Sequence, residues 1–209
     1  VGSEMCIRDR ISIIIAEDQY MLRKAMVQLI EFNDQMNVIE DCGNGVDAFD
    51  FIEKYHPDIA ILDIEMPGLT GLEVLVKIKE FKLDTKVIIV TTFKRPGYFE
   101  KAVANDVDAY VLKERSVEDL IQTIQNVMKG EKEYSTSLMT TLFKESNPLT
   151  HKEQVVLREI GNNLSSKEIA EKLYLSDGTV RNYTSNIIDK LNADNRFNAW
   201  KQAKEKGWI

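Results

Sequence analysis

Cysteine is scarce in this sequence, and long apolar runs are missing from it. The two cysteines, Cys6 and Cys42, lie far apart and form no metal-ligand spacing, which is typical of a chain kept reduced inside a cell. No apolar run approaches the roughly 20 residues that cross a bilayer. Residues 1–10 lack the apolar core of a secretory signal and do not join the pattern that starts at Ile11. We therefore expect a cytoplasmic protein with no membrane partner, preceded by an extraneous leader at 1–10.

Positive charge is also in short supply, and the shortage is unevenly spread. The chain has 27 Lys and Arg residues against 34 Asp and Glu residues, a net charge of −7. Residues 11–130 hold 13 basic and 21 acidic residues, whereas residues 148–209 hold 10 and 8. A chain of 209 residues is expected to form one or two domains. We predict an acidic module joined to a mildly basic one, although so small a positive charge does not by itself predict nucleic-acid binding.

Strand and helix patterns alternate through the first module. Short β-branched or apolar runs predict strands over 11–16, 37–42, 58–63, 86–91 and 109–112. Amphipathic stretches predict helices over 19–32, 46–55, 72–78, 97–104 and 116–129, with a stop at Gly130. Five strands alternating with five helices predict an α/β fold with a doubly wound five-stranded parallel sheet.

Charged and hydroxyl side chains follow the predicted strands at the points where they end. A lone acid there most often caps the next loop, but here the strand ends together supply a set: Glu17, Asp18, Asp63, Thr91 and Lys113. The carboxyl ends of such strands form the ligand-binding edge of the sheet. Three carboxylates that lie close together repel unless a cation sits among them, and carboxylates with room for water suit Mg²⁺. With Mg²⁺ and Lys113 neutralising an incoming phosphoryl group, Asp63 could act as a nucleophile and become an acyl phosphate.

The same set predicts a packing switch. The Thr91 hydroxyl could donate to a phosphoryl oxygen and be drawn towards it, and Tyr110 could rotate into the space left. Two alternatives stay open, namely that Tyr110 is a fixed edge aromatic and that Glu17 is simply solvated. We also predict that the bulk of Phe93 slows hydrolysis of the phosphoryl group.

At residues 11–130 this pattern resembles the receiver domain of two-component response regulators. The matching residues are Glu17, Asp18, Asp63, Met66, Pro67, Gly68, Gly71, Thr91 and Lys113. The resemblance implies that a sensor histidine kinase phosphorylates Asp63. It also implies that Mg²⁺ is bound by Asp18, Asp63 and the main-chain carbonyl of Glu65, with Glu17 assisting, and that Thr91 and Tyr110 form the family's switch pair. Glu114 stands where many receivers have proline, so the peptide geometry after Lys113 stays open.

A linker and an all-α module follow. Residues 131–147 are polar and predict a linker, in which residues 138–144 could form a short helix. Thr150 and Glu153 form a capping box before an apolar run, and Asn163 suits a left-handed helix end. Further helices are predicted over 167–173, 177–191 and 195–206. Two helices joined by a short turn, the second longer, are the mark of a helix-turn-helix domain.

The second helix of that pair has a polar face that suits DNA. Its exposed residues are predicted to be Thr179, Arg181, Asn182, Thr184, Ser185 and Asn186. Arg and Asn pair with guanine and adenine edges, and Lys167 and Thr179 are placed for phosphates. The alternative is a polar helix face in a small bundle.

Residues 148–207 resemble the DNA-binding domain of the LuxR/NarL type, through the segments 149–153, 165–170, 175–176, 179–181 and 186–191. The resemblance implies that Arg181, Asn182 and Ser185 read bases. Tyr183 replaces the family's usual His, and Ser185 stands where a basic residue is common, so the operator sequence stays open. The last helix resembles the family's dimerisation helix, with core packing as the alternative.

Taken whole, the chain is identified as a response regulator of the NarL/LuxR type and not as an enzyme, with domains at 11–130 and 148–209. The expected mechanism is phosphorylation of Asp63, formation of a homodimer, and binding of two recognition helices to double-stranded DNA. An aspartyl-phosphate phosphatase is one rival, but its second acid would be Glu65 and its nucleophile would follow the third strand. A phosphorylation-independent DNA-binding protein with a vestigial receiver is the other, and the complete acidic, hydroxyl and lysine set argues against it.

Overall fold

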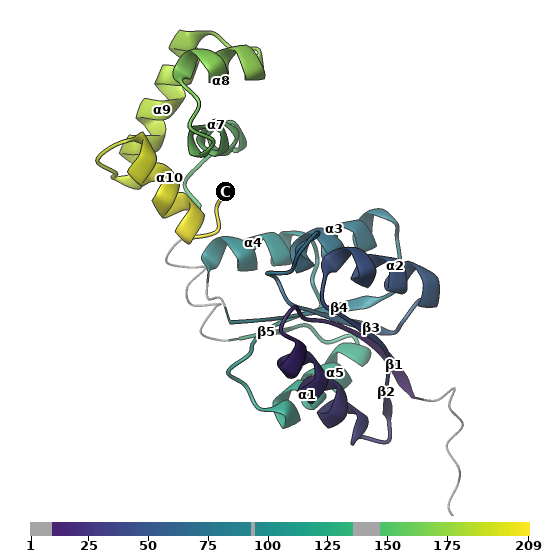
Figure 1. Ribbon diagram of the computed structural model, residues 1–209. Helices are drawn as coiled ribbons and strands as arrows, with labels where there is room; N and C mark the ends of the chain where they lie inside the picture. The colour runs from purple at the N-terminus through teal and green to yellow at the C-terminus, as the bar shows by residue number, and fades with distance from the viewer. Residues whose placement is uncertain (1–9, 93–94, 136–146) are drawn as a thin grey trace, which may run out of the picture. The chain divides into compact units, whose positions relative to one another are not determined.

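The computed structural model describes residues 10–92, 95–135 and 147–209, which form two compact units (Figure 1). Three expectations lie outside the described residues: the leader expected at 1–10, apart from Arg10, the role of Phe93 and the short helix over 138–144. Within the described ranges, none of the helices combines the length and the hydropathy that crossing a bilayer requires.

The first unit is built on a parallel sheet. Its strands are β1 (Ile11–Ala16), β2 (Met36–Cys42), β3 (Ile59–Leu62), β4 (Lys86–Thr91), β5 (Ala109–Leu112) and β6 (Glu133–Tyr134). They lie in the order β2-β1-β3-β4-β5-β6. Because the chain runs outward from β1 to β2 and then returns to β3 on the other side, strand order reverses between β1 and β3. In open α/β sheets a crevice forms at such a switch point, beyond the carboxyl ends of the strands.

Helices cover both faces of this sheet, which confirms the doubly wound α/β fold. Figure 1 shows α1 (Tyr20–Glu31) and α5 (Val117–Met128) on one face, and α2 (Gly45–Tyr55), α3 (Gly71–Glu80) and α4 (Pro96–Ala104) on the other. Strands β3 and β5 are buried at every residue, as expected of central strands in a parallel sheet. The core under α1 and α5 includes Ile13, Ile15, Met26, Ile30, Ile59, Ile61, Ile88, Val111 and Ile124.

Strand β6 was not predicted, and it lies in the segment expected to be linker. It pairs in parallel with β5, where Ala109 is opposite Glu133 and Tyr110 is opposite Tyr134. Side chains fix it in place, since Glu133 accepts from Arg115 at 2.5 Å and from the Thr123 hydroxyl at 3.0 Å. A strand of two residues is too short to show a period of two in a sequence, so five strands could be read and the sixth could not.

The second unit is helical among its described residues. It includes residues 95–100 at the start of α4 and contains α7 (His151–Gly161), α8 (Ser166–Leu173), α9 (Asp177–Leu191) and α10 (Arg196–Glu205). The predicted capping box is present, since the Thr150 side chain accepts from the Glu153 amide and the Glu153 carboxylate accepts from the Thr150 amide at 2.7 Å. Asn163 has the predicted left-handed backbone, with φ of 60°. Helix α10 packs Ala199 and Ala203 into the core of this unit.

Candidate functional site

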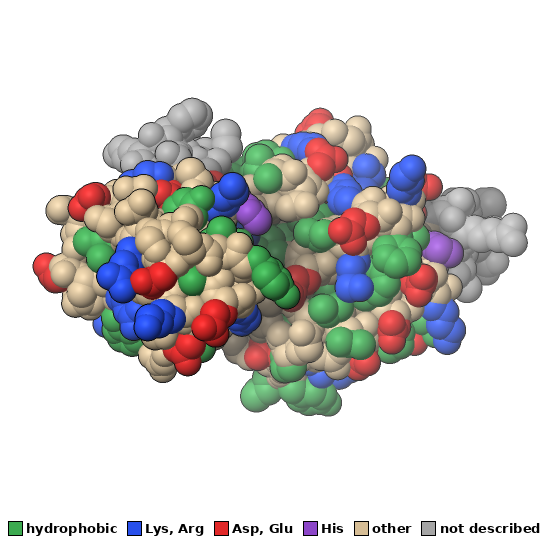
Figure 2. Space-filling view, turned by 90° about the horizontal axis from the view of Figure 1, so that it is seen from above, with side chains coloured by type: hydrophobic (Ala, Val, Ile, Leu, Met, Phe, Trp, Pro, Cys, Tyr) green, Lys and Arg blue, Asp and Glu red, His purple; other side chains and the backbone are tan. Residues whose placement is uncertain are grey.

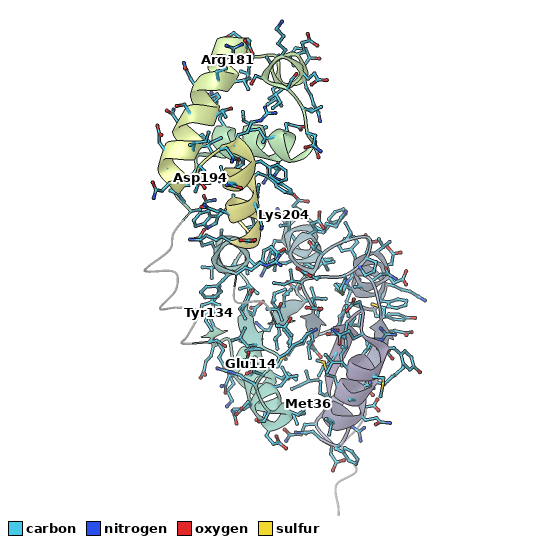
Figure 3. The ribbon with its side chains drawn as sticks, turned by 60° about the vertical axis from the view of Figure 1, so that its left-hand side comes forward. Met36, Glu114, Tyr134, Arg181, Asp194 and Lys204 are labelled. Carbon is cyan, nitrogen blue, oxygen red and sulfur yellow. The ribbon has the colours of Figure 1, made fainter. Side chains whose placement is uncertain are left out.

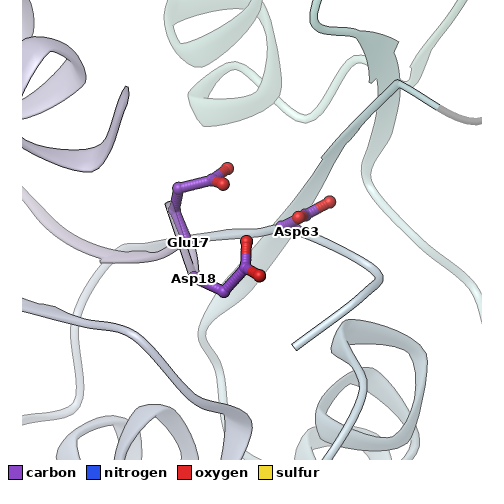
Figure 4. A group of neighbouring side chains, drawn as sticks. All are labelled: Glu17, Asp18 and Asp63. Atoms are coloured by element: carbon purple, nitrogen blue, oxygen red, sulfur yellow. The ribbon is translucent and has the colours of Figure 1, made fainter. Parts of the chain in front are cut away.

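An acidic pocket forms where β1 and β3 end. The two strands pair in parallel with Ala16 opposite Leu62, so the residues that follow leave the sheet side by side. One carboxylate oxygen from each of Glu17, Asp18 and Asp63 lies within 4.8 Å of the other two. Figure 4 shows the three side chains grouped together. Glu17 and Asp63 are buried, whereas Asp18 is exposed. The three acids that the sequence predicted to lie close together therefore do so, at the switch point of the sheet.

Lys113 joins this pocket from the end of β5. Its Nζ lies 2.5 Å from a Glu17 oxygen and 3.0 Å from an Asp63 oxygen. The remaining Glu17 oxygen accepts from the Gln19 amide at 3.2 Å, so Glu17 is not a solvated surface acid. Thr91 is fully buried at the end of β4, and its carbonyl accepts from the Lys113 amide at 2.9 Å. Among the described residues, the pocket thus has one ammonium group, that of Lys113, beside three carboxylates.

Burial of Glu17 and Asp63 changes how these acids titrate. Burial raises the pKa of Glu17, and Lys113 only partly offsets the effect. Burial likewise raises the pKa of Asp63, against the lowering effects of Lys113 and of the Ile64 amide, which donates to Asp63 at 2.7 Å. A cation among the carboxylates would relieve this penalty, and the exposed Asp18 opens the cluster to solvent. An all-oxygen donor set with access for water fits a hard cation such as Mg²⁺.

The loop after Asp63 is held by close backbone contacts. A Cβ on Gly71 would lie 2.2 Å from the Asp63 carbonyl oxygen, so only glycine fits there. Gly68 has φ of +79°, a left-handed conformation that glycine adopts without strain. The Gly71 amide donates to the Ile64 carbonyl and the Gly45 amide to the Pro67 carbonyl. Glu65 lies between these two fixed points.

Tyr110 and the peptide after Lys113 were open questions. Tyr110 is fully buried on β5, between β4 and β6, so it is not an edge aromatic. The edge alternative was wrong, because β6 pairs with β5 on its outer side. The sequence could not show this, because it did not predict β6. The Lys113–Glu114 peptide is trans, since no cis peptide occurs among the described residues.

The second, longer helix of the predicted helix-turn-helix pair is α9. Of its predicted readers, Arg181, Asn182 and Ser185 are exposed, and Figure 3 shows Arg181 near the N-terminal end of the helix. Val180 and Ile187 are buried on the opposite face. Lys167 on α8 is exposed as predicted. The exposed set on α9 thus forms a surface distinct from the packed one.

Two residues of α9 that were predicted to be exposed, Thr184 and Thr179, differ from expectation, and Tyr183 had been assigned to neither face. Thr184 is half-buried and its hydroxyl donates to the Val180 carbonyl at 2.8 Å. Thr179 is half-buried, and its hydroxyl shares a 2.8 Å hydrogen bond with Ser176. Tyr183 packs against the core of the domain. A helix-face projection places these side chains at the edge of the exposed face, and it cannot show which hydroxyls are already hydrogen-bonded to their own helix.

One contact on this face was missed. Arg181 forms an ion pair with Asp177, at 2.7 Å between Nη2 and Oδ2. The spacing of four residues on a helix is the signal that could have found it. Figure 2 shows acidic and basic side chains interspersed on the drawn face of the molecule.

Comparisons with known proteins agree with both parts of the geometry. Residues 13–125 match the response regulator receiver domain, and residues 147–203 match the luxR family of bacterial regulatory proteins. The transcriptional regulatory protein DesR of Bacillus subtilis (strain 168) is 46% identical over 199 residues, which cover 95% of this chain and 99% of that protein.

Two solved structures are also similar. The crystal structure of a DNA-binding response regulator of the LuxR family from Staphylococcus aureus is 65% identical, with a TM-score of 0.55, and covers 56% of this chain and 98% of its own. The structure of two RcsB dimers bound to two parallel DNAs has a TM-score of 0.68 and covers 94% of this chain and 98% of its own. At 24% identity the RcsB likeness concerns the fold alone.

Proposed function

Because the chain belongs to the LuxR family of DNA-binding two-component response regulators, we propose that a sensor histidine kinase phosphorylates Asp63 and that the phosphorylated chain dimerises and binds promoter DNA in the cytoplasm. The family consists of transcription regulators and not of enzymes, so the phosphatase alternative is set aside. The observation that carries the proposal is the pocket in which Glu17, Asp18 and Asp63 lie together and Lys113 pairs with both Glu17 and Asp63.

The phosphoryl transfer is a direct displacement. An Asp63 oxygen attacks the phosphorus of a phosphohistidine on the kinase, the P–N bond breaks, and the electron pair leaves with the imidazole. Asp18, Asp63 and the main-chain carbonyl of Glu65 would hold Mg²⁺, with Glu17 assisting, and the ion would neutralise phosphoryl charge. Lys113 already lies 3.0 Å from Asp63 and would contact a phosphoryl oxygen there.

The response would pass through two buried side chains. Thr91 ends β4 with no exposed surface and would donate its hydroxyl to the phosphoryl group. Tyr110, which is equally buried, would repack as Thr91 moves. Since tightly packed groups change between discrete arrangements, a small shift at the pocket would become a two-state change in the unit.

Dimerisation would use an outer helix face, and α1 offers one. Met21 is 85% exposed and Phe32, at the end of the helix, is 83% exposed. They are about three helical turns apart and therefore lie on one side of α1. RcsB has been solved as dimers bound to DNA. By analogy, a second copy of this chain would cover the face and bring two α9 helices to two half-sites.

On DNA, α9 would enter the major groove. Arg181, Asn182 and Ser185 would read base edges, while Lys167 and Thr179 would contact phosphates. Because Thr179 already bonds Ser176, its contribution would require that bond to be shared or exchanged.

The first test measures mass in solution by light scattering, with Mg²⁺ and beryllofluoride, a phosphoryl mimic, and without them. We expect a monomer-to-dimer shift in the wild type and none in Asp63→Ala. An unchanged mass in the wild type would contradict phosphorylation-driven dimerisation. If Asp63→Ala bound promoter DNA as tightly as the phosphorylated wild type, the phosphorylation-independent alternative would be correct instead.

A second pair of variants tests the dimer surface. Met21→Glu should prevent the shift, because it places a charge in the proposed apolar interface. Phe81→Glu is the matched control, since Phe81 is also an exposed large side chain but lies at the end of α3 on the other side of the sheet. Loss of the shift in both variants, or in neither, would contradict the assignment to α1.

A further inference from the structure

We propose that Asp177 is a positioning residue that fixes the guanidinium group of Arg181 and thereby sets the base preference of α9. The inference rests on the proposed DNA-reading function of this helix. It concerns an acid that neither the sequence pattern nor the reading role of Arg181 required.

The contact lies at the end of the helix that would enter DNA. Asp177 is the first residue of α9, directly after the cap residue Ser176, and Arg181 is one turn further along. Their side chains are 33% and 68% exposed, and one Asp177 oxygen lies 2.7 Å from Nη2 of Arg181. The positive end of the helix dipole stabilises a carboxylate at this position, so the anchor of the pair is itself held in place.

Two features make Asp177 unfavourable if it has no further role. Its Oδ1 atom is buried and has no hydrogen-bond partner among the described residues. A buried oxygen without a partner reduces stability. In addition, a negative charge on the surface that approaches DNA is repelled by the phosphates, so it weakens sequence-independent binding.

The contact with Arg181 and the negative charge become useful if the task of Asp177 is selectivity. An unrestrained arginine can contact a phosphate or any acceptor on a base. With Nη2 engaged by Asp177, the guanidinium is held in one orientation and still has further N–H groups for the O6 and N7 acceptors of guanine. The carboxylate also disfavours the approach of a phosphate to Arg181. Asp177 would therefore lower affinity for all DNA and raise the preference for guanine opposite Arg181.

The test compares full-length variants activated with Mg²⁺ and beryllofluoride. Wild-type protein first selects sites from a randomised duplex pool, and Arg181→Ala identifies the base position at which its preference disappears. Competition titrations then use the selected duplex and its single-base variants at that position. We expect Asp177→Asn to reduce discrimination there by about tenfold, within the range of one lost bidentate contact. Its affinity for unrelated duplex should rise several-fold, since one negative charge is removed.

Two further variants separate this role from a general effect of charge or stability. Glu205→Gln is the matched control, because Glu205 forms another i,i+4 pair, with Lys201 on α10, at 4.0 Å. It should leave base preference unchanged. Asp177→Glu keeps the charge and can reach Arg181, so it should keep most of the preference.

The outcomes distinguish failure of the positioning role of Asp177 from failure of the proposed DNA-reading function of α9. If the wild type selected no sequence, the DNA-reading proposal itself would fail. If the wild type selected a site and Arg181→Ala erased one position, but Asp177→Asn kept full discrimination, the positioning role would be wrong. An equal loss in Glu205→Gln, or a loss in Asp177→Glu as large as in Asp177→Asn, would also overturn it.

Discussion

Buried acids occur in both units, and they behave in opposite ways. In the receiver, Glu17 and Asp63 are 2% and 5% exposed, and burial raises the pKa of each. In the DNA-binding unit, Glu153 is 3% exposed. Burial alone would raise its pKa too, but hydrogen bonds from Lys190 and Thr150 outweigh burial and lower it.

Burial is the largest single influence on the pKa of all three acids, and their hydrogen-bond donors offset it to different degrees. Glu153 accepts from Lys190 at 2.8 Å and from the amide and hydroxyl of Thr150 at 2.7 and 2.9 Å, so a single carboxylate has three donors. In the pocket, Lys113 is shared between Glu17 and Asp63. A carboxylate with ample donors stabilises the fold. A cluster with too few donors remains available for a cation and a phosphoryl group, which is the difference between a structural and a functional acid.

Removing Lys113 should have the largest effect on stability, because Glu17 and Asp63 would lose a donor that they share. Lys113→Ala leaves two buried carboxylates without their ammonium partner, and we expect the free energy of unfolding at pH 7 to fall by about 3 kcal/mol. Urea unfolding measures the change. Mg²⁺ should restore part of the loss in the variant, since a bound cation stabilises the folded state. Lys201→Ala, at an exposed pair on α10, should change stability by less than about 0.5 kcal/mol. Similar losses of stability in Lys113→Ala and Lys201→Ala would contradict a special role of Lys113 in the pocket.

The pocket can also be broken without any change of charge. Gly71→Ala places a Cβ 2.2 Å from the Asp63 carbonyl oxygen, so the backbone that carries the phosphoacceptor must move. We expect a loss of about 2 kcal/mol in thermal or urea unfolding and weaker binding of beryllofluoride. The control is Gly178→Ala in α9, where the nearest atom to the new Cβ is 3.9 Å away. That substitution should stabilise the helix by up to about 1 kcal/mol. The two substitutions should therefore change the stability in opposite directions.

A substitution at Glu153 tests the buried acid that has three donors. Glu153→Gln loses the ion pair with Lys190 and should lower stability at pH 7 by about 1.5 kcal/mol. Because the pKa of Glu153 lies below its usual value of 4.5 in the fold, its contribution is complete above 4.5 and disappears as the pH falls through the folded value. The difference between wild type and variant in urea unfolding should therefore vanish in acid. Glu168→Gln, in the exposed capping box of α8, should have a smaller effect. A difference that grew in acid would contradict this account.

The sequence predicted the acids of the pocket well and their environment poorly. Glu17, Asp18, Asp63 and Lys113 were predictable because parallel strands end at one edge of a sheet, so that order along the chain becomes proximity in space. The sharing of Lys113 between two acids was not predictable, because it depends on side-chain conformations.

The misses in the rest of the chain have similar causes. Strand β6 is too short to leave a pattern, and without it Tyr110 looked like an edge residue. Tyr174 adopts a left-handed backbone with φ of 55° at the end of α8, where its side chain is 96% exposed. Asn163 could be assigned to such a position because Asn favours it. A tyrosine in the same conformation follows no residue preference and so gave no signal.

The smallest expected effect is an increase in folding stability. It tests most directly whether the buried acids of the pocket differ from Glu153. Asp63→Asn removes one charge from the crowded pocket. Because burial raises the pKa of Asp63 above its usual value of 3.8, the wild type loses stability as the pH rises from 3.8 through the folded value. The variant escapes that loss and should be more stable at pH 7 by about 1 kcal/mol, with the gain vanishing below the usual pKa.

Urea unfolding across this pH range, with and without Mg²⁺, measures the Asp63→Asn effect. Mg²⁺ should stabilise the wild type more than the variant and so narrow the gap, because the cation needs the carboxylate that the variant lacks. Asp18→Asn is the control, since its exposed carboxylate keeps its water and should give a smaller gain. A loss of stability in Asp63→Asn at pH 7 would mean that Lys113 satisfies Asp63 as fully as Lys190 satisfies Glu153. The pocket would then be a structural ion pair, and phosphorylation would have to break it.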